Sequence, residues 1–350
     1  MFEKLFQAAI NHNANDIHLS VGAPPVLRVG GKLIPLKTDN LTVEDINNVM
    51  RGLTPASCMV MLSKTGNTDF AYDYDEHRFR ITVFRQRGKV GMVMRHFRNI
   101  LFTPKELRIP EQVCEKVLHS KGLFLASGPT GSGKTTTIGS LIDLININQS
   151  KHIVTIEDPV ELVHPHKSCI ITQREVGTDV NSFVDGLHWS MRQDPDVIVV
   201  GEIRDQETAR TSLRAADTGH LVMGTIHARS CASAITRIVS EFSSEEQSFI
   251  RSQLSEALLG IITQALVPTY DGRGVLSVME ILMNTATVSS LIRQEKENLV
   301  SDEIRKGKAL GMMDFDENLW NLCVSKAINF NDALYFSRDQ VRFKERRPEK

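Results

Sequence analysis

Apolar and polar positions follow one pattern over the first hundred residues and another after residue 122. In the first part, DIHLSV, VLRV and KLIPL alternate apolar with polar side chains, which is typical of strands buried on one face. Turns at Gly30-Gly31 and at Arg87–Lys89 predict two hairpins. LTVEDINNVMRGL has helical spacing and a start signal, Thr42 followed by Asp45. These elements predict a small α+β module of strands with one or two helices.

After Gly122, short and continuously apolar strands alternate with helical segments. Such an order indicates an α/β fold with a parallel sheet covered by helices on both faces. Ligands of such sheets bind at the carboxyl ends of the strands, and those ends are polar here. We therefore expect one binding site at that edge. The predicted strands are LFLAS, HIVTI, VIVV and LVMGTI, and the first helix carries Ile138, Leu141, Ile142 and Ile145.

Cap signals frame this core on both sides. Thr103–Glu106 has the form of a capping box, and Pro110 opens a helix that Gly122 is expected to end. Ser243 opens a predicted long helix further along. The apolar positions of that helix are Phe249, Ile250, Leu254, Leu258, Ile261 and Ile262.

The end of the chain is predicted to be helical apart from one hairpin at Asp271-Gly272. Helices continue to about Leu334, and the final QVRFKERRPEK is expected to be a frayed, charged tail. The expected parts are an N-terminal module (1–98), a linker (99–116), the core (117–270) and a C-terminal hairpin with helices and tail (271–350).

Composition narrows the classes of protein. The chain has 350 residues with a net charge of -1 and no overall bias toward polyanions, so no nucleic-acid partner is expected, and a nucleic-acid translocase is disfavoured. It contains no run of eighteen apolar residues and no basic-then-apolar leader, which favours the cytoplasm. Its five cysteines are scattered, and His164 and His166 lack further ligands at suitable spacing, so no structural zinc is expected.

GPTGSGKT lies between the first of these strands and its helix, the context that a phosphate-binding loop requires. Glycines let backbone amides approach phosphates, Lys134 is placed to reach the β- and γ-phosphates, and the Thr135 hydroxyl is placed to bind Mg²⁺. ATP and Mg²⁺ are therefore the expected cofactors; the alternative is a glycine-rich turn before a helix. The candidate nucleotide-binding residues are Gly128, Pro129, Thr130, Gly131, Ser132, Gly133, Lys134, Thr135 and Thr136.

Glu202 follows the apolar strand VIVV directly after Gly201. Most phosphate-loop enzymes place an Asp at the position of Gly201 to hold Mg²⁺. Glu202 is therefore expected to act catalytically on the attacking water, or on the metal shell directly or through water. The alternative is a carboxylate that caps the helix beginning near Arg204.

Two further strand ends carry candidates. IEDPVEL supplies Glu157, Asp158 and Glu161, and several carboxylates beside a triphosphate repel one another unless Mg²⁺ and water lie between them. Asp158 is therefore a candidate magnesium ligand, directly or through water; a solvated acidic turn is the alternative. His220 and His227 bracket LVMGTI, and His227 is expected to sense the γ-phosphate or the water, with ordinary packing as the alternative.

Together, GPTGSGKT, TIEDPVEL, VGEIRD and GHLVMGTIH resemble the Walker A, Asp box, Walker B and His box of the PilT/PilU pilus-retraction ATPases, in the secretion ATPase superfamily. The resemblance places Glu202 at the Walker B glutamate, Glu161 among the catalytic Asp-box acids, and His220 with His227 in the His box. NANDIHLSVGAPPVLRVGGKL and LGMMDFDENLWNL extend it over nearly the whole chain. It implies an α/β protein: a PAS-like α+β module followed by a RecA-like P-loop ATPase core with C-terminal helices.

The resemblance also implies a function. Such relatives are hexameric ATP-hydrolysing motors that retract type IV pili for twitching motility, acting from the cytoplasm on a platform protein at the inner membrane. Arginines of their N-terminal module help bind ATP, which makes Arg80 and Arg95 candidates; a solvated strand face is the alternative. Two other readings stay open: an accessory PilU-type ATPase that needs a PilT partner, and a nucleotide-dependent regulatory or assembly subunit with little turnover.

Three features bear on which relatives are closest in role. Pilus assembly and type II secretion ATPases are longer and usually carry a four-cysteine zinc site, so retraction is favoured over extension. QRGKVGMVMR is closer to PilU-type sequences. Retraction motors typically carry AIRNLIRE, whereas this chain has TVSSLIRQ at Thr287–Gln294. Leu291 and Ile292 are expected to be packing residues, and Arg293 is expected to be buried against a partner and to couple turnover to retraction.

Overall fold

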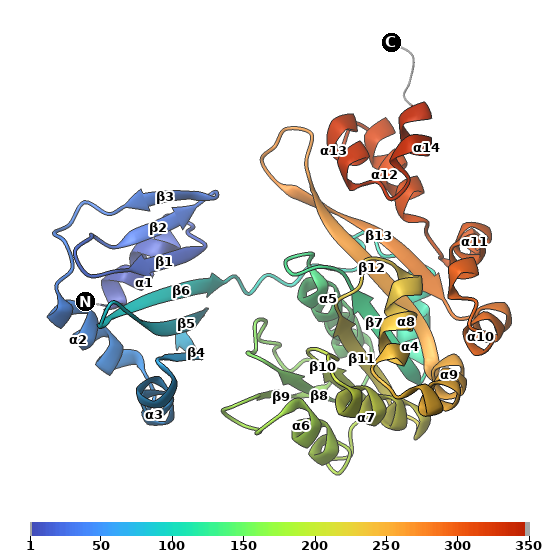
Figure 1. Ribbon diagram of the computed structural model, residues 1–350, viewed down its shortest axis with the longest axis horizontal. Helices are drawn as coiled ribbons and strands as arrows, with labels where there is room; N and C mark the ends of the chain where they lie inside the picture. The colour runs from blue at the N-terminus through green and yellow to red at the C-terminus, as the bar shows by residue number, and fades with distance from the viewer. Residues whose placement is uncertain (1, 347–350) are drawn as a thin grey trace. The chain divides into compact units, whose positions relative to one another are not determined.

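The computed structural model describes residues 2–346, which form two compact units (Figure 1). The first contains residues 2–100 together with Pro159–Val163. The second contains Leu101–Asp158 and the chain from His164 onward. Each unit has its own apolar core. Among the described residues, no helix combines the length and apolar character needed to cross a bilayer.

The first unit is one antiparallel sheet with three helices, the α+β module that the sequence predicts. The strand order is β3-β2-β1-β6-β5-β4. Both predicted hairpins are confirmed, and their turn residues Gly30, Gly31, Arg87 and Gly88 have the positive φ that such tight turns need. The elements are α1 (Phe2–Asn11), β1 (Asp16–Leu19), β2 (Val26–Val29), β3 (Lys32–Pro35), α2 (Val43–Leu53), α3 (Ala56–Thr65), β4 (Asn67–Tyr74), β5 (His77–Gln86) and β6 (Lys89–Phe97).

The helices of this unit show what local pattern can and cannot predict. Thr42 and Asp45 form the predicted capping box at the start of α2. The prediction of one or two helices is wrong, because α1 and α3 are also helical. In α1, Phe6 is fully buried with its ring centroid 4.4 Å from that of Phe79. Phe6 and Phe79 lie far apart in the sequence, so the local pattern gives no sign of their contact.

The second unit is built on a seven-stranded sheet in the order β13-β12-β7-β11-β10-β8-β9. The four predicted strands are parallel neighbours or near neighbours, as expected. Two more parallel strands, β9 and β12, widen the sheet, and β13 adds an antiparallel edge. The strands are β7 (Gly122–Ser127), β8 (His152–Glu157), β9 (Ile170–Glu175), β10 (Val197–Val200), β11 (Leu221–Ile226), β12 (Leu258–Pro268) and β13 (Val275–Met283).

Helices connect and flank these strands (Figure 1). Helix α4 covers part of the segment expected to be a linker, and it belongs to the second unit. The helices are α4 (Glu111–His119), α5 (Lys134–Asn148), α6 (Phe183–Ser190), α7 (Gln206–Asp217), α8 (Cys231–Ser240), α9 (Ser244–Ala257), α10 (Ala286–Arg293), η1 (Glu297–Leu299), α11 (Val300–Lys306), η2 (Lys308–Leu310), α12 (Phe315–Val324), α13 (Phe330–Phe336) and α14 (Gln340–Glu345).

The predicted long helix after Ser243 is too long. Helix α9 ends at Ala257, and the apolar residues from Leu258 onward form strand β12. The apolar run fits helical spacing by chance, but it is paired on both sides, with β7 and with β13. Gly260 suits this place: a Cβ there would lie 2.8 Å from the backbone oxygen of Leu282 on β13.

Two cap signals act differently from the prediction. Thr103 and Glu106 form the reciprocal hydrogen bonds of a capping box, yet only a single turn follows and no helix. Gly122 does not end the preceding helix: α4 ends at His119, and Gly122 is the first residue of β7. Its φ of +129° and a Cβ position 2.5 Å from the backbone oxygen of Ala257 explain the glycine.

Helices α12–α14 pack beside the outer part of the β12–β13 hairpin (Figure 1) and share a small apolar core with it. The prediction of a frayed tail is wrong for Gln340–Glu345, which is α14 and buries Phe343. The last four residues of that predicted tail lie outside the described residues. Arg293 is exposed, contrary to prediction, and donates a hydrogen bond to Ser255 Oγ, whereas Ile292 is buried as expected.

We predict that Gly260→Ala lowers the free energy of unfolding by about 1–3 kcal/mol, because the added methyl group meets a backbone oxygen that cannot move aside. Chemical denaturation measures this. Gly274→Ala is the control, since a Cβ there finds only ordinary contacts with Thr269 at 3.7 Å or more. Equal stability of the two variants would contradict the close β12–β13 packing at Gly260.

Candidate active site

The loop between β7 and α5 has the geometry of a phosphate cradle. Gly128, Gly131 and Gly133 all have positive φ, which residues with side chains rarely adopt. A Cβ on Gly128 would lie 2.4 Å from both the Gln264 carbonyl oxygen and Ser132 Oγ. The Ser132 hydroxyl is itself buried, with no hydrogen-bond partner among the described residues. Backbone amides at the start of α5, together with this hydroxyl, fit an anionic group.

Lys134 is the first residue of α5 and is only 8% exposed. Its Nζ donates to the carbonyl oxygens of Gly128 and Pro129 at 2.9 and 3.0 Å. Two neutral carbonyl oxygens thus hold the ammonium group over the loop. A negatively charged phosphate group attracts it more strongly and can replace them. Thr135 and Thr136 follow on the first turn of α5, partly exposed, where a hydroxyl can reach a metal ion bound to a phosphate.

Glu202 and His227 meet beside this loop. His227 Nε2 lies 3.2 Å from Glu202 Oε1, and His227 Nδ1 lies 3.2 Å from the Gly128 carbonyl oxygen and 3.5 Å from Lys134 Nζ. The alternative that Glu202 caps the next helix does not hold, since Asp205 is the N-cap of α7. The ends of β7, β10 and β11 therefore bring a lysine, a carboxylate and a histidine into one site.

The three other strand-end candidates, Glu157, Asp158 and Glu161, differ in their surroundings. Asp158 is exposed, and within residues 2–346 neither Asp158 nor Glu161 forms a side-chain hydrogen bond or ion pair. Glu161 belongs to the segment Pro159–Val163 of the first unit. Glu157 accepts hydrogen bonds from Thr155 and Gln173 at 2.6 and 3.1 Å. The Glu157 carboxylate at the end of β8 is thus partly engaged in holding β8 to β9.

His220 lies at the opposite end of β11 from His227. The strand between them has six residues, so about 20 Å separates the two ends. His220 Nδ1 contacts the Ala215 carbonyl oxygen at 2.9 Å, which ties the end of α7 to the start of β11. Within one chain, then, His220 is not part of the group around Lys134.

Arg80 and Arg95 lie opposite one another on β5 and β6 of the first unit. Like charges in that arrangement repel, and each is neutralised by a carboxylate. Arg80 donates to Asp69, with Nε–Oδ2 at 2.8 Å, and Arg95 Nε donates to Asp16 Oδ1 at 2.9 Å. The Arg95 side chain is still 64% exposed, so it stays accessible to a second anion.

Gln264 on β12 is a supporting residue that sequence reasoning missed. Its Nε2 donates to the Ser132 carbonyl oxygen at 2.7 Å, and its Oε1 accepts from the Thr137 hydroxyl at 2.8 Å. Gln264 is 2% exposed and so fixes the phosphate loop to α5 from inside. The only sequence signal for it is the polar pair Thr263-Gln264 within LLGIITQALVP, and the helical spacing of the apolar residues before it conceals the strand.

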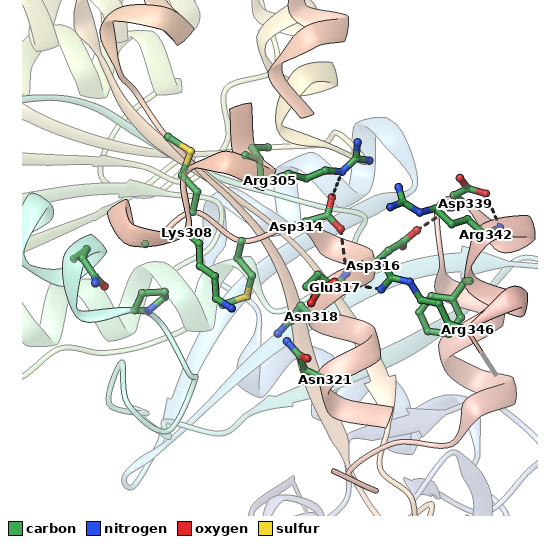
Figure 2. Close-up of a pocket in the computed structure, with 17 residues that line it drawn as sticks. Arg305, Lys308, Asp314, Asp316, Glu317, Asn318, Asn321, Asp339, Arg342 and Arg346 are labelled. Atoms are coloured by element: carbon green, nitrogen blue, oxygen red, sulfur yellow. Dashed lines mark hydrogen bonds and ion pairs between the residues drawn. The ribbon is translucent and has the colours of Figure 1, made fainter. Parts of the chain in front are cut away.

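A cavity of about 490 Å³ lies elsewhere, among α4, α11, α12 and α14 (Figure 2). Its charged groups largely neutralise one another: Arg305 pairs with Asp314 and Arg346 with Glu317. None of the candidate site residues lines it. The β7–α5 loop, and not this cavity, is therefore the candidate phosphate site.

A phosphate cradle with a lysine, beside a carboxylate and a histidine at neighbouring ends of a parallel sheet, defines an ATPase of the P-loop class. Comparison with known families is more specific. The Type II/IV secretion system protein family matches residues 80–310, and the chain belongs to that family.

Similarity to individual proteins covers almost the whole chain. It is 37% identical to the Pseudomonas aeruginosa type IV pilus retraction ATPase PilT over 99% of this chain and 98% of PilT. It is 35% identical to the type IV pilus ATPase PilU of the same organism, over 95% and 87%. The crystal structure of the pilus retraction motor PilT with bound ADP superposes with a TM-score of 0.91, at 40% identity over 98% of both chains. The predicted resemblance to the PilT/PilU family is confirmed.

We predict that Gln264→Leu raises the KM for ATP and lowers stability by about 2–4 kcal/mol, since two buried groups, the Ser132 carbonyl and the Thr137 hydroxyl, lose their partner. Nucleotide titration and denaturation measure the two effects. Gln247→Leu is the control, because the Gln247 side chain on α9 donates to the Phe242 carbonyl oxygen, away from the phosphate loop. Unchanged ATP affinity in Gln264→Leu would show that this residue does not shape the phosphate loop.

Proposed function

We propose that this chain is an ATPase motor that powers type IV pilus retraction. The observation that carries the proposal is the similarity to the retraction motor PilT over 98% of both chains, with the phosphate loop, Glu202 and His227 assembled in one site. Neutral charge and the absence of a basic stripe disfavour a nucleic-acid substrate.

The site residues divide the work of ATP hydrolysis. Lys134 and the loop amides bind and orient the phosphates, and Glu202 accepts a hydrogen bond from the attacking water and draws its proton. His227 holds the Glu202 carboxylate in place. Bound Mg²⁺ supplies charge neutralisation at the phosphates. The Thr135 hydroxyl would hold it, with Glu202 and Asp158 reaching its shell directly or through water.

Further elements of the proposal follow the same family pattern. The motor works as a homo-hexamer on the cytoplasmic side, against a platform protein of the pilus machine at the inner membrane. Arg80 and Arg95 exchange a carboxylate partner for nucleotide phosphates during the cycle, and Glu161 and His220 contribute from the Asp and His boxes. Exposure of Arg95 supports this exchange.

A second candidate is an accessory ATPase that retracts pili only together with a PilT-type paralogue. The 35% identity to PilU is close to the 37% identity to PilT, which supports this second candidate. Complementation decides: the gene for this chain is returned to cells that lack both its own copy and any PilT-type paralogue. Restored twitching supports the motor alone, and twitching restored only with the paralogue supports the accessory role. A regulatory subunit would show little steady-state hydrolysis when pure.

We predict that Lys134→Ala abolishes ATP turnover and weakens nucleotide binding, whereas Glu202→Gln keeps nucleotide binding and loses hydrolysis by about 10²–10⁴-fold, the usual contribution of a general base. Fluorescent-nucleotide titration and phosphate release measure the two steps. Glu207→Gln, an exposed carboxylate on α7, is the control and should behave as wild type. Near-normal hydrolysis by Lys134→Ala would remove the phosphate-loop assignment.

A further inference from the structure

The segment from His227 to Cys231, which joins β11 to α8, is held by hydrogen bonds along its whole length. Arg237 Nη1 donates to the His227 carbonyl oxygen at 3.0 Å, and Ser127 Oγ at the end of β7 donates to that of Ala228, also at 3.0 Å. Because His227 contacts Glu202 and Lys134, whatever fixes this segment also fixes the geometry of the site.

Two further hydrogen bonds to this segment come from residues outside the strands and helices that carry the nucleotide site. Arg338, between α13 and α14, donates through Nη2 to the Arg229 carbonyl oxygen at 2.8 Å. Glu280 on β13 accepts from the Cys231 backbone N–H at 2.5 Å. Arg338 and Glu280 also pair with each other. The pair thus clamps the segment at two peptide groups, one carbonyl and one amide.

The pair is built to be rigid. The Glu280 side chain is 4% exposed. Its buried carboxylate is stabilised by the ion pair with Arg338 and by the hydrogen bond from the Cys231 amide. Cys231 lies beside it, and burial first and the Glu280 charge second raise the pKa of that thiol well above its usual value. The thiol therefore stays protonated, and the carboxylate faces no competing thiolate.

Arg338 is fixed from its own side as well. Asp316 of α12, on the wall of the cavity in Figure 2, accepts from the backbone amides of Arg338 and Asp339 at 2.9 and 3.0 Å. The guanidinium carbon lies 4.5 Å from the centroid of the Phe315 ring. Arg338 is thus a stiff link between the C-terminal helices and the segment that carries His227.

We propose that Arg338 and Glu280 are positioning residues for ATP hydrolysis: they hold the His227–Cys231 segment so that His227 keeps Glu202 aligned, and they make the C-terminal helices part of the active-site scaffold. The inference rests on the proposed ATPase activity. Neither residue touches the nucleotide loop, so they act on the chemical step through His227 and leave nucleotide binding largely unchanged.

Purified full-length variants test this. Arg338→Gln should lower kcat by about tenfold to a hundredfold with the KM for ATP within about twofold, as a small displacement of a catalytic group does. Arg346→Gln is a matched control and should keep wild-type kcat: Arg346 pairs with Glu317 and stacks on Trp320, and its side chain is 30% exposed against 31% for Arg338. The double variant Glu280→Gln/Arg338→Gln removes both charges and serves if Arg338→Gln alone unfolds.

A cycle with His227 separates positioning from general damage. In a His227→Ala background, Arg338→Gln should lower kcat no further, because the residue through which it acts is gone. A full additional loss in that background would overturn the proposal, as would unchanged kcat in Arg338→Gln or in His227→Ala. If the proposed function itself is wrong, the result differs. Pure wild-type protein then hydrolyses no ATP, or it hydrolyses ATP but does not restore pilus retraction in cells.

Discussion

The parallel pairing of β7 with β11, and of β11 with β10, is the constraint on which the site depends. Ser127 lies level with Ile226, and Val200 lies level with Gly224. In this register the residues that follow each strand leave the sheet at the same edge: the phosphate loop, Glu202 and His227. A shift of register in any of these strands would separate the three groups, because the loops that carry them are short. Catalytic geometry is therefore set by backbone hydrogen bonds between buried strands.

Strand pairing in the same sheet also explains how β12 shapes the phosphate loop, although that loop follows β7. Thr263 lies level with Ser127, so the next residue, Gln264, comes beside Gly128. A side chain of amide type can donate to one backbone carbonyl and accept from one hydroxyl at once, and Gln264 does both. The absence of a Cβ on Gly128 is required by the same approach of β12. The glycine of the motif thus serves packing as well as phosphate access.

Sequence reasoning reached the elements with strong local signals and missed those fixed by distant contacts. The four parallel strands, both N-terminal hairpins and the meeting of Lys134, Glu202 and His227 were predictable, because apolar runs and glycine motifs are local. The apolar run of strand β12 also fits the spacing of a helix, and only its pairing with β7 and β13 makes it a strand. Helix α14 looked like a charged tail, and its single anchor, Phe343, finds its partners on α12 and α13. Gln264, Glu280 and Arg338 carry no motif at all, since their roles arise from strands and helices distant in sequence.

The position of His227 between Lys134 and Glu202 has a chemical consequence. A lysine ammonium and a carboxylate free to approach would pair directly, and neither would then be available to phosphate or water. His227 Nε2 lies 3.2 Å from Glu202 Oε1, and His227 Nδ1 lies 3.5 Å from Lys134 Nζ, so the imidazole ring contacts both groups. The imidazole therefore lies between the two ends of the site and keeps Lys134 and Glu202 from pairing directly, so the ammonium group stays available to phosphate and the carboxylate to water.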